Sequence, residues 1–284
     1  MKISTTTSAF THWGDSEEIL SLLKDCGFTA YDCSLEKVEI LTRAEYADEA
    51  KKLRAYADEL GLPCNQTHAP FPLIRKGDEV YNADRFTLAV RAIEVSGILG
   101  AKVCVVHASN DYTMQENLDF YNRLVPYAKT ANVKIGVENL YNWWKWGKPE
   151  GHILPGGVCS HHDEFFAYME RLDKDVFTAC VDIGHAELMR EFGTDAAKMI
   201  ESLGSYMGAM HLHDVDYLHD NHAYPYSCKV DFEKVIEALK KIGYQGDITM
   251  EASLPVKNVP RPLIPAATKY LAEIGKYFKS RLEE

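Results

Sequence analysis

Short apolar runs alternate with longer amphipathic stretches along the whole chain. Each run is followed by a loop and then by a helix-like stretch that ends at a glycine or a turn. Eight runs have the length and composition of β-strands, at residues 2–5, 30–33, 64–68, 102–107, 134–138, 177–182, 208–213 and 247–251. Helices are predicted between and after them, at about 16–26, 42–60, 84–99, 114–131, 162–172, 186–190, 195–203, 231–243 and 263–282.

This repeated order predicts an α/β protein. Strands separated by helices are joined by right-handed crossovers and lie parallel, and a count of eight favours a closed (β/α)8 TIM barrel. An open doubly wound sheet is the alternative, but no GxGxxG or GxxxxGK(S/T) motif follows any strand. No Ser/Gly-rich linker or shift in composition interrupts the series, so residues 1–284 are predicted to form a single domain.

Six consecutive predicted strands end in side chains that bind metals or transfer protons. In order, the third to eighth strands end in His68, His107, Glu138, Asp182, His211 or His213, and Glu251. In a barrel these ends form the rim where active sites lie, and alternation along each strand points these side chains inward. The neighbouring apolar residues then face the helices: Val106, Ile135, Val137, Val181, Met210, Leu212, Ile248 and Met250.

Three carboxylates buried at one rim need a compensating positive charge, and a divalent cation supplies it. Two Glu, one Asp and one His form an oxygen-rich set that suits Mn²⁺, Mg²⁺ or Co²⁺, whereas further imidazole ligands would favour Zn²⁺. His185 follows Asp182 by three residues and is expected on the same rim. Taken singly, a carboxylate at a strand end is more often a helix N-cap or a loop anchor, and a lone histidine is more often structural.

The stretch from Gly208 to His222 reads GAMHLHDVDYLHDNH and is the densest in histidine and aspartate. Its three aspartates and four histidines do not all fit one site. His213, Asp220 and His222 are expected either to support the metal ligands or to bind further metal ions. Asp214, Asp216 and His219 are expected to be loop residues.

Composition narrows the classes of function. The chain is 46% hydrophobic and 26% charged, which is typical of a globular protein. A net charge of -11 argues against a nucleic-acid partner, because phosphate binding depends on Lys and Arg. No apolar run is long enough to predict a membrane span, and no signal peptide is recognisable. Seven scattered cysteines indicate reduced thiols and therefore a cytoplasmic location.

Several of these segments together resemble the xylose-isomerase-like TIM barrels, a family that includes sugar (phosphate) isomerases and epimerases and the type IV apurinic endonucleases. The matching segments are THAPF at His68, VCVVHAS at His107, IGVENL at Glu138, CVDIGHAEL at Asp182, MHLHDVD at His211 and GDITMEAS at Glu251. The resemblance covers the third to eighth strands. It is specific as a set, although no single segment is.

The sugar-epimerase branch of the family implies a divalent-metal-dependent isomerase or epimerase, of the ketose 3-epimerase or aldose–ketose isomerase type. Its ligand pattern implies one ion, most simply Mn²⁺, at Glu138, Asp182, His211 and Glu251, with His213 as the rival to His211. The two glutamates would act as acid and base, and His185 would contact the substrate. The residues expected to line the sugar site are His68, His107, Trp143, Trp144 and His222, with the tryptophans serving as a stacking platform, a lid or simply the core of a loop.

Two other activities are compatible with the resemblance. The endonuclease branch holds three zinc ions, and its additional ligands have counterparts in His68, His107, His185, Asp220 and His222. Against it stand the segment NLYNWWKWG after Glu138, where that branch has a Gly-rich polar run, and the lack of a basic surface. A metal-dependent dehydratase or lyase acting on a sugar or inositol ketone is the other alternative. If the protein is an isomerase, its partner is expected to be a small sugar. We expect that sugar to be unphosphorylated, because few basic residues lie near the site. A homo-oligomer is compatible with this function.

Overall fold

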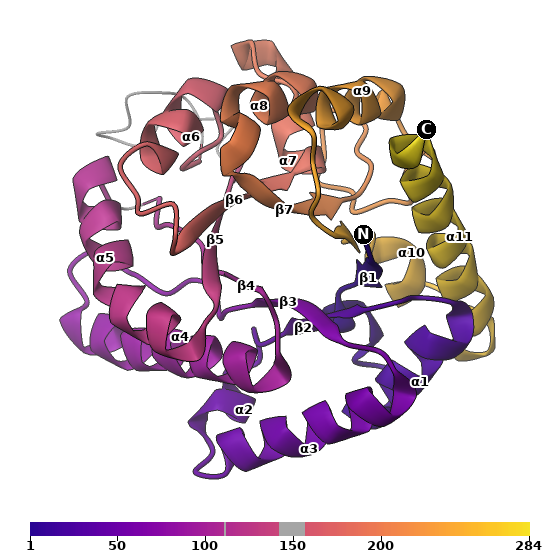
Figure 1. Cartoon of the computed structure of the whole chain (residues 1–284), viewed down its shortest axis with the longest axis horizontal. Coiled ribbons are helices and arrows are strands. Elements are labelled where there is room, and N and C mark those ends of the chain that lie inside the picture. Colours follow the sequence, from indigo (N-terminus) through magenta and orange to yellow (C-terminus); the bar gives the residue numbers. More distant parts are fainter. Residues whose placement is uncertain (111, 142–156) are drawn as a thin grey trace.

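Parallel strands form the centre of the computed structural model, which describes residues 1–110, 112–141 and 157–284. Their order in the sheet is β1-β8-β7-β6-β5-β4-β3-β2. Their bounds are β1 Ile3–Thr5, β2 Tyr31–Ser34, β3 Cys64–His68, β4 Val103–Val105, β5 Lys134–Glu138, β6 Phe177–Asp182, β7 Met207–Leu212 and β8 Ile248–Met250. A parallel bridge between Thr6 and Asp32 brings the two outermost strands together. The predicted (β/α)8 TIM barrel is therefore confirmed in the described residues (Figure 1).

Helices form the outer ring around the strands (Figure 1). They are α1 Ser16–Cys26, α2 Val38–Thr42, α3 Tyr46–Leu60, α4 Glu79–Leu99, α5 Met114–Ala131, α6 His162–Met169, α7 Ile183–Glu187, α8 Ala196–Leu203, α9 Phe232–Ile242, α10 Leu254–Lys257 and α11 Ile264–Glu283. Asp15 and Glu18 make a capping box at the start of α1, and Gly27 ends that helix in the left-handed conformation. No helix in the described ranges combines the length and apolar character needed to cross a membrane.

One predicted helix and several boundaries differ from the structure. The helix expected at 42–60 begins only at Tyr46, and a separate short helix, which was not predicted, ends at Thr42; the backbone of Arg43 between them is extended (φ −66°, ψ 148°). Two local contacts accompany the break: the Thr42 hydroxyl donates to the Glu39 carbonyl, and Arg43 pairs with Glu49. The fourth strand ends at Val105, which leaves His107 in the loop that follows.

Alternation along the strands separates two apolar regions, as the sequence predicts. The eight strand-associated residues expected to face the helices all belong to the large cluster that includes the helix side chains. The inner side of the barrel holds a small apolar cluster of Val103, Val105, Cys180 and Ala209. Polar side chains fill other inner positions: the Ser4 hydroxyl and the Asn65 amide each lie 3.0 Å from Thr249 Oγ1. The apolar core of the fold thus lies between strands and helices, and the interior is available for polar groups.

Candidate functional site

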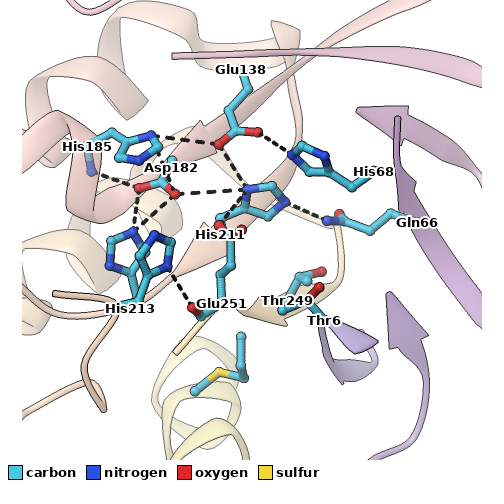
Figure 2. Close-up of polar contacts among 12 residues, drawn as sticks. Thr6, Gln66, His68, Glu138, Asp182, His185, His211, His213, Thr249 and Glu251 are labelled. Carbon is cyan, nitrogen blue, oxygen red and sulfur yellow. Dashed lines mark hydrogen bonds and ion pairs between the residues drawn. The ribbon is translucent and has the colours of Figure 1, made fainter. Parts of the chain in front are cut away.

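Four side chains from adjacent strand ends converge on one point at the rim. Glu138 ends β5, Asp182 ends β6, His211 lies on β7 and Glu251 follows β8. The Nδ1 atom of His211 is 3.1 Å from a carboxylate oxygen of Glu138, 3.1 Å from one of Glu251 and 3.9 Å from one of Asp182. One donor atom from each residue lies within 4.8 Å of the others. The structure thus brings together the four residues predicted as metal ligands (Figure 2).

The two histidines of the His-x-His pair serve different groups. His213 does not reach the centre of the four-residue group; its Nε2 lies 3.0 and 3.2 Å from the two oxygens of Asp182. It belongs to a second group with His185, Asp220 and His222, whose donor atoms also lie within 4.8 Å of one another. The geometry therefore favours His211 over His213 as the third member of the four-residue group.

A third group lies on the other side of Glu138. The Nε2 atoms of His68 and His107 are 3.0 Å apart, and they lie 3.5 and 3.7 Å from Glu138 Oε2. Glu138 is therefore shared, with one carboxylate oxygen toward His211 and the other toward this histidine pair. The predicted rim residues form three adjoining groups of metal-binding side chains rather than one.

Asn139 fixes the relative position of β5 and β6 at the site. Its side-chain amide donates to the Asp182 carbonyl (2.9 Å), and its Oδ1 accepts from the Asp182 backbone amide (2.8 Å). The Asn139 carbonyl is 3.0 Å from His185 Nδ1, and the Asp182 carboxylate accepts from the His185 backbone amide as the N-cap of α7. These bonds hold Asp182 and His185 in a defined orientation toward the rim.

Asp214 organises the loop that follows β7. Its buried carboxylate accepts hydrogen bonds from four backbone amides, at 2.8 to 3.1 Å: those of Val215, Cys228, Lys229 and Val230. The loop is thereby folded back so that His222 Nδ1 lies 2.9 Å from the Glu251 carbonyl, and its Nε2 lies 3.1 Å from Asp220. The sequence assigned Asp214 only to the loop; the structure makes it the anchor of that loop.

The ionisation of the site follows from the mixture of acids and imidazoles. Burial opposes charge on both kinds of group, but the neighbouring imidazoles hold the pKa of Glu138 and Glu251 well below the usual value. Against the same burial, Glu138 raises the pKa of His68 to about 9, and Asp182 with Asp220 raises that of His185 to about 10. His107 differs, because burial dominates and lowers its pKa to about 3. The site therefore gathers positive charge around ionised carboxylates.

A divalent cation fits this arrangement. Glu138 Oε2 and His211 Nδ1 are both buried and have no hydrogen-bond partner in the described part of the chain, although each faces groups of opposite charge. Asp220 Oδ1 in the second group is likewise buried and has no hydrogen-bond partner among the described residues. Buried acceptors and imidazole nitrogens of this kind are donor atoms for Mn²⁺ and similar ions. Glu138, Asp182, His211 and Glu251 would hold the ion.

Residues 20–274 match the xylose isomerase-like TIM barrel family. The chain belongs to this family. A curated relative, the uncharacterized protein MJ1311 of Methanocaldococcus jannaschii, is 25% identical over 195 residues. That match covers 65% of this chain and 62% of the relative, so this chain spans less than two thirds of the relative's length.

Solved structures share the fold of this family member over its full length. A D-tagatose 3-epimerase-like protein has a TM-score of 0.75 and 21% identity, with 100% of this chain and 98% of that chain covered. A D-psicose 3-epimerase with D-tagatose, from Clostridium cellulolyticum H10, also has a TM-score of 0.75, at 12% identity, with 98% of this chain and 99% of that chain covered. At these identities the likeness is one of fold.

Two residues at the site were not predicted from the sequence, and two predicted residues lie outside the described part of the chain. Trp143 and Trp144 lie in the part of the chain, 142–156, that the structure does not describe. Tyr141 was not predicted, and its ring lies 4.9 Å from that of His185. Gln66 was also missed; its amide nitrogen is 2.8 Å from His211 Nε2. The sequence could have indicated Gln66, because it lies two residues before the inward-facing His68 on the same strand and therefore faces the same side.

We predict that Asp214→Ala lowers the free energy of unfolding by about 3 kcal/mol, because several backbone donors lose a buried, charged acceptor. Chemical denaturation followed by circular dichroism measures this loss. Asp216→Ala is the matched control: that carboxylate also accepts from loop amides, those of Leu218 and His219, but in a more exposed position, and we expect a loss of about 1 kcal/mol or less. Equal losses in the two variants would contradict the anchoring role.

Proposed function

We propose that the protein is a divalent-metal-dependent sugar isomerase or epimerase, with ketose 3-epimerisation as the preferred reaction. The observation that carries the proposal is the pairing of Glu138 and Glu251. These carboxylates come from β5 and from the segment after β8, yet each lies 3.1 Å from the same nitrogen of His211. Two carboxylates that approach one point from different strands suit the removal of a proton on one side of a carbon and its return on the other.

In this mechanism Glu138 takes the proton from the carbon next to the ketose carbonyl. Glu251 first takes up a proton from solvent and delivers it to the opposite face of that carbon, and Glu138 then releases its proton to solvent. Their roles exchange in the reverse direction. The pKa of each carboxyl is held low by the surrounding imidazoles, so both are ionised before substrate binds. Glu251 is the more accessible of the two, with 19% of its side chain exposed against 2% for Glu138. Glu251 is therefore the carboxylate that solvent and substrate reach more readily.

We further propose one Mn²⁺ ion at Glu138, Asp182, His211 and Glu251; Mg²⁺, Co²⁺ and Zn²⁺ are the alternatives. When bound, the ion would polarise the substrate carbonyl and the adjacent hydroxyl, which lowers the free energy needed to remove the intervening proton. His185 would orient a substrate oxygen. Its buried ring is held near both Asn139 and Asp220, which limits its rotation.

The substrate proposed is a small unphosphorylated sugar, with His68, His107 and His222 lining its site together with Trp143 and Trp144. Two solved structures of this fold carry the names D-tagatose 3-epimerase-like protein and D-psicose 3-epimerase, which supports the class of substrate. One domain and a cytoplasmic location are part of the same proposal, and an unpaired state of all seven cysteines agrees with that location.

We predict that Glu251→Gln retains sugar binding but loses about 10²–10⁴-fold in turnover, because an amide neither accepts nor donates the proton at carbon. Formation of product from each ketose of a panel with Mn²⁺, followed by NMR in D₂O, measures the loss. The same screen separates an epimerase from an aldose–ketose isomerase and from a dehydratase by its products.

Glu79→Gln serves as the control for this test. Glu79 is an exposed carboxylate in the first turn of α4, outside the rim groups, and its variant should retain the parental rate. Normal turnover by Glu251→Gln would refute the acid–base assignment.

A second candidate is a tri-zinc phosphodiesterase of the apurinic-endonuclease type. The observation in its favour is that His68 and His107, and separately the His185–Asp220–His222 group, adjoin the four-residue group and provide donors for two more ions. The net charge of -11 counts against it, because a DNA backbone requires compensating Lys and Arg. The sugar enzyme is therefore preferred.

Counting the metal distinguishes the two candidates. We predict one tightly bound ion per chain, measured by elemental analysis after reconstitution with excess Mn²⁺ and with excess Zn²⁺ followed by gel filtration. His107→Ala removes a donor that the four-residue group does not use, so the count should stay at one. Three zinc ions in the parent, two in His107→Ala, and cleavage of an abasic-site duplex would establish the phosphodiesterase instead.

A further inference from the structure

A buried glutamine is in direct contact with the histidine at the centre of the four-residue group. Gln66 is 2% exposed and comes from β3, on the opposite side of His211 from the carboxylates (Figure 2). His211 Nδ1 faces Glu138 and Glu251, whereas its Nε2 faces Gln66 Nε2 at 2.8 Å. Both nitrogens of this ring thus have assigned neighbours, and Gln66 is the neighbour on the side away from the carboxylates.

Alternation from His68 turns Gln66 into the barrel, and an irregularity in β3 adds Asn65 beside it. The register between β2 and β3 pairs Tyr31 with Cys64 and Asp32 with Gln66, which leaves Asn65 as an extra residue. The side chains of Asn65 and Gln66 both turn into the barrel as a result, where Asn65 donates to Thr249 and Gln66 meets His211.

The contact between Gln66 and His211 matters because a neutral imidazole carries a proton on only one of its two nitrogens. One ring nitrogen carries the proton and the other accepts, so the partner of Nε2 determines which nitrogen is free. With the Gln66 amide nitrogen toward the ring, Nε2 accepts and Nδ1 carries the proton toward Glu138 and Glu251. A cation bound by Nδ1 requires the opposite tautomer, in which Nε2 donates. Rotating the Gln66 amide by half a turn presents its oxygen as the acceptor that this tautomer needs.

We propose that Gln66 is a positioning residue that holds the ring of His211 so that Nδ1 faces Glu138 and Glu251, where a cation would bind. A primary amide is suited to this task because it can donate or accept at nearly the same position. A metal-ligating histidine commonly donates its other N–H to such a partner, and loss of the partner typically costs 10–100-fold in metal affinity. The inference rests on the metal site of the proposed function, and it assigns a role to a residue that does not itself bind the metal.

The test compares Gln66→Met with Gln66→Glu. Methionine has a similar shape and no hydrogen-bonding capacity of this strength, so we expect Mn²⁺ affinity, measured by competition with a chelator, to fall 10–100-fold. Glutamate restores an acceptor for Nε2–H, and its affinity should lie within about threefold of the parent or above it. A residue that merely fills space would give the reverse order, because methionine is tolerated in a core and a buried carboxylate is not.

Asn65→Leu is the matched control. It removes the adjacent buried amide, whose partner is Thr249 and not a ligand, and should leave Mn²⁺ affinity within about twofold.

The outcomes distinguish the role of Gln66 from the proposed metal site. Mn²⁺ binding by the parent together with unchanged affinity in Gln66→Met would overturn the role of Gln66 and leave the proposed function standing. Failure of the parent to bind Mn²⁺, Mg²⁺, Co²⁺ or Zn²⁺ would overturn the metal site itself and the inference with it.

Discussion

The rim of this barrel is built around one electrostatic constraint: Glu138, Asp182 and Glu251 share a small space that is largely closed to water. Like charges buried together raise the free energy of the folded protein unless opposite charge lies among them. His211 stands between the carboxylates, and the raised pKa values of His68 and His185 show that other imidazoles also respond to them. A divalent cation would supply the same positive charge as these protons, which is why we propose the same residues as a metal site.

The constraint extends to groups that carry no charge. A group that must stay close to other carboxylates needs support from its neighbours, and polar contacts provide such support at three places in the site. Asn139 binds both backbone polar groups of Asp182, and Gln66 contacts the far nitrogen of His211. Asp214 holds the loop that returns His222 to the Glu251 carbonyl. The charged centre is thus fixed by polar contacts beneath and beside it.

The sequence predicted most of the barrel and the convergence of the rim residues, because both follow from simple periodicities. Alternation placed His68, Glu138 and His211 inside, and parallel strands necessarily bring their ends together. The sequence did not predict the contacts that depend on the exact register of the strands or on the path of a loop. An extra residue at Asn65 turns that side chain into the barrel beside Gln66, and only the path of the loop shows that Asp214 binds the amides of residues 228–230. Alternation alone did not separate His211 from His213, since both are polar positions on one stretch; the family resemblance favoured His211, and the structure places the two histidines in different groups.

That separation bears on how the two candidate activities differ. Asp182 lies between the two histidines, with one oxygen 3.9 Å from His211 Nδ1 and both oxygens within 3.2 Å of His213 Nε2. Charge placed in either group therefore acts on the other through a shared carboxylate. Because the donors for one ion and for three are present together, ligand identity does not distinguish a sugar enzyme from a phosphodiesterase. The surroundings of these donors have to distinguish the two activities. A chain with a net charge of -11 favours a small uncharged substrate over a polyanion.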